Sequence, residues 1–186
     1  MDNKDTSLEL TQEYLAEFLF ETVDLPKDEL LNIAKKFLDQ ISKKLSNEPL
    51  EETIFTSLED ASHTQPIYVN GLKFVSLCKH HLMPYFGSVN IAVLPKNKIA
   101  GISQFNKLVE VLSNSLSLQE ELTKNICNKI NDALAADGVY VQLKANHLCS
   151  EIKNNNNAVS EIITTFANGV YELDFNLRTE ATLNFS

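Results

Sequence analysis

The chain has 186 residues, of which 44% are hydrophobic, and it carries a net charge of −9 at neutral pH. This length is sufficient for one full hydrophobic core, and the acidic balance argues against nucleic acid as a main partner, because phosphate backbones select basic surfaces. No apolar run approaches the roughly 20 residues of a membrane span, and the first ten residues are too polar for a secretory signal. We therefore expect a cytoplasmic protein with no membrane or nucleic-acid partner.

The first part of the chain, residues 1–49, predicts an N-terminal helical arm. Residues 11–24 and 27–46 both carry apolar side chains at helical spacing. A polar linker at about 47–65 separates this arm from the rest of the chain.

The remainder, residues 50–186, predicts a single α+β catalytic domain. Its expected elements are, in chain order, strands at 66–77 and 88–94, helices at 103–116 and 118–136, and strands at 138–148 and about 158–167. Asn70-Gly71 predicts a turn or bulge within the first strand, and Asp137-Gly138 is expected to end the second helix. The order of elements favours a four-stranded, mainly antiparallel sheet with two helices packed on one face.

Two short sequences, CKHH from Cys78 and HLC from His147, contain five of the seven histidines and cysteines in the chain. The Cys-x-x-His pair and the distant cysteine supply three zinc ligands, Cys78, His81 and Cys149. A fourth coordination position then stays open, as in catalytic zinc sites. The two remaining histidines, His80 and His147, are candidates for proton transfer beside the metal.

The same residues also fit a purely structural interpretation. Cysteine is often a small buried hydrophobic residue, and consecutive histidines can simply end a strand. One Cys-x-x-His is also a weaker signal than a paired Cys-x-x-Cys. From spacing alone, zinc binding and plain packing stay open as equal alternatives. Cys127 falls within a helical pattern and is expected to pack.

With these motifs in this order, the chain resembles GTP cyclohydrolase I. The similarity covers about residues 50–180 and rests on four segments, which are SLCKHHLMPYFG from Ser76, AGIS from Ala100, LQEELT from Leu118 and ANHLC from Ala145. The resemblance implies a tunnelling fold, in which subunits join their sheets into a barrel and stack as a homodecamer of two pentamers. It also implies hydrolytic opening of the GTP imidazole ring at C8, which releases formate and gives 7,8-dihydroneopterin triphosphate for folate or pterin biosynthesis.

The resemblance further implies roles for residues around the metal and the base. Zn²⁺ would be held by Cys78, His81 and Cys149, while His80 and His147 would transfer protons. Glu120, together with the backbone around Gln119, would accept hydrogen bonds from the guanine N1–H and 2-amino group. Adenine lacks this donor pair.

For the triphosphate, the resemblance implies Ser103 at the start of its helix, where free backbone N–H groups attract anions. Three lysines would neutralise the phosphates as point charges: Lys36, Lys107 and Lys153. Plainer alternatives stay open, because Glu120 also fits a capping box that begins at Ser117, and Ser103 also fits a helix N-cap.

The match departs from the family at a few charged positions. Lys79 stands where the family usually has glutamate, and a cation there opposes zinc binding unless it points to solvent. Gln104 and Asp39 stand where the family has phosphate-contacting lysines. The alternative function is therefore a non-catalytic or altered-specificity relative with a weakened triphosphate site, acting as a guanine-nucleotide-binding or assembly protein.

Overall fold

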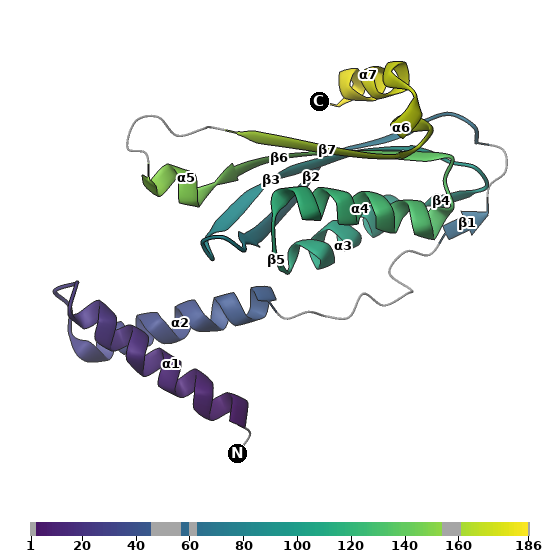
Figure 1. Ribbon diagram of the computed structural model, residues 1–186. Coiled ribbons are helices and arrows are strands. Elements are labelled where there is room, and N and C mark those ends of the chain that lie inside the picture. Colours follow the sequence, from purple (N-terminus) through teal and green to yellow (C-terminus); the bar gives the residue numbers. More distant parts are fainter. Residues whose placement is uncertain (1–2, 46–56, 60–62, 154–160, 186) are drawn as a thin grey trace. The chain divides into compact units, whose positions relative to one another are not determined.

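Figure 1 shows the computed structural model, which describes residues 3–45, 57–59, 63–153 and 161–185. The chain divides into two compact units, Met1–Ser46 and Asn47–Ser186. The predicted domain boundary between residues 49 and 50 lies outside the described residues.

The N-terminal unit is a pair of helices, α1 (Asn3–Phe20) and α2 (Lys27–Leu45). They pack through Ala16, Leu30 and Ala34, which are buried. Alanine at the contact lets two helix backbones approach closely, since it adds little volume between them. The two predicted helices are confirmed, although α1 begins at Asn3 rather than at residue 11.

The second unit is a mixed α+β structure built on a five-stranded sheet with the order β5-β2-β3-β6-β7. Its long strands are β2 (Ile67–Cys78), β3 (Pro84–Leu94), β6 (Gly138–His147) and β7 (Ile162–Gly169), and each pairs antiparallel with its neighbour. These are the four predicted strands. The predicted strand count was nevertheless wrong, because a two-residue strand, β5 (Leu116–Ser117), pairs parallel with the end of β2. A separate small sheet joins β1 (Ser57–Glu59) to β4 (Lys98–Ala100).

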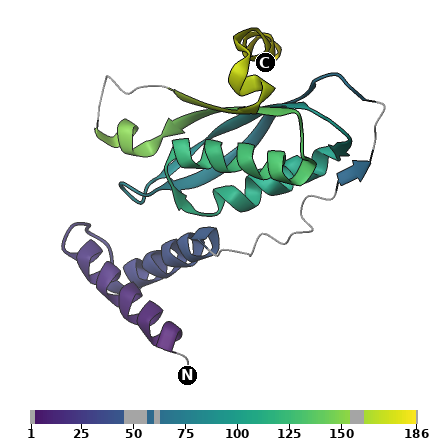
Figure 2. The ribbon, with the colours of Figure 1, turned by 45° about the vertical axis from the view of Figure 1, so that its right-hand side comes forward.

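Two helices, α3 (Ile102–Ser113) and α4 (Gln119–Leu134), cover one face of the large sheet, as predicted (Figures 1 and 2). In α4, Leu122, Ile126 and Ile130 recur every four residues and are all buried against the sheet. The same core takes the inward-facing residues of β6, including Val139 and Val141, because side chains alternate along a strand.

Three helices lie outside the prediction: α5 (Leu148–Lys153), α6 (Val170–Leu173) and α7 (Phe175–Asn184). The last two carry Tyr171 and Phe185 onto the opposite face of the sheet, where Tyr140 is buried with them. Asp174 starts α7 by accepting hydrogen bonds from the backbone N–H groups of the next helical turn.

Two local predictions have different outcomes. Gly71 adopts a φ of 72° where the register of β2 against β3 shifts, so the predicted bulge is confirmed. The predicted helix end at Asp137-Gly138 was wrong: α4 ends at Leu134, and Ala135 takes the left-handed conformation. Among the helices of the described segments, none has the length and apolar character needed to span a membrane.

Candidate metal and substrate site

A pocket of about 200 Å³ lies where the ends of β2 and β6 meet the first turn of α4. Its lining includes every cysteine and histidine of the two motifs that carried the zinc prediction: Cys78, His80, His81, His147 and Cys149. Strand β3 brings the two motifs together, because Pro84 pairs with Leu77 of β2 while Tyr85 pairs with His147 of β6. Leu118, Gln119, Glu120 and Ile162 complete the lining.

Three of these side chains form a group that could hold a metal ion. The ligand atoms of Cys78, His147 and Cys149 all lie within 4.8 Å of one another. Two thiols and an imidazole are the donors that Zn²⁺ prefers. The predicted ligand set shares both cysteines with this group, whereas His81 is exposed and lines the same pocket outside the group.

The loop between β2 and β3 presents His80 and His81 to the pocket. It closes tightly, since the Cys78 N–H donates to the Met83 carbonyl at 2.9 Å and the Leu82 N–H donates back to the Cys78 carbonyl at 2.8 Å. Leu82 takes a φ of 56°, which is uncommon for a residue other than glycine and marks a strained turn.

His147 is held from two directions. Its ring stacks on Tyr85 with a centroid distance of 4.7 Å and an interplanar angle of 6°. Its Nε2 lies 2.8 Å from Oε1 of Gln119. Burial lowers the pKa of His147, and the nearby Glu120 carboxylate partly opposes that shift, so the imidazole is biased toward its neutral form.

Gln119 is buried, and its side chain is engaged within the protein. Its Nε2 donates to the Leu143 and Ile162 carbonyls and to Oγ1 of Thr164, at 3.0–3.2 Å. A predicted guanine contact at Gln119 is therefore left to its backbone, as the resemblance implied. The sequence carried no signal for these side-chain bonds, because they join three elements that are distant along the chain.

Glu120 does not cap the start of helix α4. Helix α4 begins after Leu118, and Glu121 accepts a hydrogen bond from the Leu118 N–H at 3.1 Å. The capping alternative for Glu120 is therefore wrong. Ser117 also does not cap the helix, since its Oγ lies 3.1 Å from the Tyr85 hydroxyl. Glu120 is exposed and lines the pocket.

Comparison with known proteins decides the family. The sequence model of GTP cyclohydrolase I matches residues 13–185. The chain belongs to the GTP cyclohydrolase I family. This membership confirms the family and the enzyme class that the motifs predicted.

Curated relatives agree with this assignment. GTP cyclohydrolase 1 of Streptococcus agalactiae is 35% identical over 149 residues, which cover 80% of this chain and 78% of that protein. GTP cyclohydrolase 1 of Fusobacterium nucleatum is 36% identical, with 83% of each chain covered. Among solved structures, the apo archaeosine synthase QueF-Like aligns with a TM-score of 0.45 and 18% identity, over 58% of this chain and 96% of that chain.

Ser103 and Lys107, which the GTP cyclohydrolase I resemblance assigned to the triphosphate, are not among the residues that line the pocket. Gly101 is the N-cap of α3, so the capping alternative for Ser103 is wrong, and Gln104 accepts a hydrogen bond from the Gly101 N–H. The 12 residues of α3 extend about 18 Å, and its C-terminal end leads to β5 and the pocket. Ser103 therefore lies at the far end of this helix from the pocket. Lys107 pairs with Glu110 at 3.5 Å.

The other two lysines lie on helices α2 and α5. Lys36 is exposed on α2, in the N-terminal unit. Lys153 is the last residue of α5, and its side chain lies outside the described residues.

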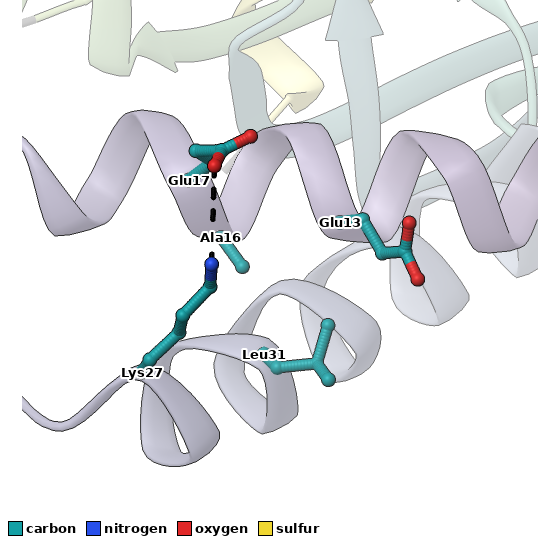
Figure 3. Close-up of a pocket in the computed structure, with 5 residues that line it drawn as sticks. All are labelled: Glu13, Ala16, Glu17, Lys27 and Leu31. Carbon is teal, nitrogen blue, oxygen red and sulfur yellow. Dashed lines mark ion pairs between the residues drawn. The ribbon is translucent and has the colours of Figure 1, made fainter.

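The N-terminal unit of this GTP cyclohydrolase I family member contains a cavity of its own, of about 310 Å³. Glu13, Ala16 and Glu17 of α1 face Lys27 and Leu31 of α2 around it (Figure 3). Lys27 lies 3.8 Å from Glu17 in an exposed ion pair. This lining has no thiol or imidazole, so the pocket at Cys78 is the better candidate for chemistry.

Proposed function

We propose that the protein opens the imidazole ring of GTP by hydrolysis at C8, releasing formate and giving 7,8-dihydroneopterin triphosphate. The observation that carries this proposal is that a Cys-His-Cys donor group, Glu120 and two further histidines line one pocket. Membership of the GTP cyclohydrolase I family supports the choice of reaction.

Zinc is the metal that we propose for the pocket, with Cys78, His81 and Cys149 as its ligands. His81 follows the Cys-x-x-His spacing and lies on the tight loop that begins at Cys78. When bound, a zinc ion supplies Lewis acidity and lowers the pKa of a water toward neutrality. The pKa of His147, lowered by burial, favours a neutral imidazole that accepts a proton near neutral pH.

Recognition of guanine is assigned to Glu120. A carboxylate offers two acceptor oxygens, which match the N1–H and 2-amino donors of guanine. A site built for these donors discriminates against adenine, which lacks both, because the carboxylate would then have no hydrogen-bond partner on the base. His80 lines the same pocket and is the second proton-transfer residue in this proposal.

We propose that the working enzyme is a homo-oligomer, with the decamer of two pentamers and the tunnelling fold that the resemblance implies. Ser103 and Lys107 lie on α3, and Ser103 is at the end of that helix away from the pocket. In the oligomer they would serve the triphosphate of a GTP bound to a neighbouring copy. The enzyme would act in the cytoplasm, in folate or pterin biosynthesis.

The test is to incubate the zinc-loaded protein with GTP and to measure formate and, after oxidation and dephosphorylation, neopterin fluorescence. The wild type should turn over GTP but not ATP, and Cys149→Ser should lose both zinc and turnover. A zinc-loaded oligomer that binds GTP and produces no formate would overturn the proposal. That result would favour a guanine-nucleotide-binding protein without catalysis, consistent with Lys107 being engaged by Glu110.

A further inference from the structure

The orientation of the Gln119 amide is fixed by its neighbours. Its Nε2 faces the carbonyl oxygens of Leu143 and Ile162, at 3.2 and 3.0 Å. Carbonyl oxygens only accept hydrogen bonds, so the atom that faces them has to be the NH₂ group. The opposite atom, Oε1, therefore faces His147.

This orientation determines where His147 carries its proton. Oε1 of Gln119 only accepts hydrogen bonds, and it lies 2.8 Å from Nε2 of His147. Nε2 therefore has to be the protonated nitrogen. In the neutral imidazole, Nδ1 is then the nitrogen that keeps a free lone pair.

Further hydrogen bonds hold the Gln119 side chain on the side away from His147. Gln119 is 3% exposed, and its NH₂ group also donates to Oγ1 of Thr164 at 3.1 Å. Thr123 lies within hydrogen-bonding distance of Thr164, at 2.6 Å, and donates to the backbone carbonyl oxygen of Gln119 at 2.8 Å. Elements α4, β6 and β7 thus hold one amide in one orientation, while the stacked ring of Tyr85 fixes the plane of the His147 ring.

We propose that Gln119 is a positioning residue that holds His147 as its Nε2–H tautomer and leaves Nδ1 as the proton acceptor in the pocket. The catalytic consequence rests on the proposed function, since His147 transfers protons during GTP ring opening. The tautomer itself is a property of the folded protein and is measured without substrate.

Two substitutions separate positioning from mere packing. Gln119→Leu removes the acceptor for His147 together with the donor for the carbonyls. Gln119→Glu keeps an acceptor oxygen toward His147 but points a second oxygen at the Leu143 and Ile162 carbonyls, which destabilises the fold. The glutamate variant should therefore be the less stable of the two and yet the more active. Cys127→Ala, which alters packing in the same helix away from the pocket, is the matched control.

We expect zinc-loaded Gln119→Leu to lose about a hundredfold in kcat, as for a misplaced catalytic group, with KM for GTP within about twofold of wild type. Gln119→Glu should retain more kcat than Gln119→Leu despite its lower Tm, and Cys127→Ala should keep wild-type kcat. In ¹⁵N-histidine spectra, the wild type should show His147 protonated at Nε2, and Gln119→Leu should lose that preference.

Three results would overturn the proposal: activities that follow the Tm order, loss of zinc from Gln119→Leu, or a wild-type His147 protonated at Nδ1. If the wild type does not turn over GTP, the proposed function fails, and the ¹⁵N spectra still decide the tautomer.

Discussion

Lys79 and Glu121 form an ion pair that joins the loop after Cys78 to the first turn of α4. The Lys79 ammonium donates to Oε1 of Glu121, while Oε2 accepts the hydrogen bond from the Leu118 backbone. These two hydrogen bonds lower the pKa of Glu121. The unusual cation next to Cys78 is therefore balanced by a carboxylate, which reduces its opposition to zinc.

Reversing one charge of this pair should loosen the loop, and reversing both should restore it. Lys79→Glu sets two carboxylates against each other, so we expect a Tm a few degrees below wild type. The double variant Lys79→Glu/Glu121→Lys should recover part of that loss. Both side chains are about half exposed, so the effect should shrink in about 1 M salt. Thermal melts at low and high salt test this. If the Tm of the double variant falls by the sum of the losses in Lys79→Glu and Glu121→Lys, the two side chains are not coupled and the prediction is wrong.

Zinc content distinguishes the two histidines that compete for the third ligand position. The proposed ligand set predicts that His81→Ala loses zinc and that His147→Ala keeps it while losing turnover. Metal analysis after dialysis checks this, with Cys149→Ser as the zinc-free reference. The opposite pattern would make His147 the ligand, in agreement with its 4.8 Å grouping with the two cysteines.

Neutralising Glu120 should weaken GTP binding without affecting stability. Loss of charge-assisted hydrogen bonds to guanine predicts a KM for GTP raised by roughly 10- to 100-fold in Glu120→Gln, with an unchanged Tm. The matched control is Glu121→Gln, because the adjacent Glu121 holds the helix start instead. If Glu120→Gln lowers only Tm, guanine recognition by this residue is excluded.

Cys127 should make the fold sensitive to alkaline pH. Burial raises the pKa of its thiol to about 12, and its Sγ donates to the Val139 carbonyl at 3.4 Å. Between the ordinary thiol pKa of about 9 and about 12, the unfolded chain loses this proton and the native chain keeps it. The free energy of unfolding therefore falls as pH rises through this range. Denaturant melts at pH 8 and pH 10 should show a larger loss for wild type than for Cys127→Ala, and equal losses would argue against it.

The sequence predicted the elements whose apolar residues repeat regularly, and it could not predict those that depend on partners. Helices α3 and α4 and strands β2, β3, β6 and β7 follow their own periodicity. Strand β5 exists only because Leu116 and Ser117 pair with the end of β2. Helix α7 is stabilised by packing on the sheet rather than by a marked pattern of its own.

In the candidate site, too, some residues could be predicted from the sequence and others depend on contacts between distant segments. The motif spacing predicted Cys78, His81 and Cys149 as ligands with His147 beside them, and the structure brings the two cysteines together with His147 rather than with His81. The Gln119–His147 contact could not be predicted, because a glutamine at a helix start can face either solvent or a half-buried imidazole with no difference in the surrounding sequence.

The short ladder in which Cys78 pairs with Ser117 has a consequence for redesign of the enzyme. The backbone sets the spacing between the sulfur proposed for the metal and the carboxylate proposed for the nucleobase, because Glu120 follows Ser117 by only three residues, in the first turn of α4. A variant intended for another nucleobase should therefore exchange the side chain at position 120 alone. An insertion or deletion between Ser117 and Glu120 would shift the bound base, and with it C8, relative to the proposed metal site, so such a variant should bind its new ligand without converting it.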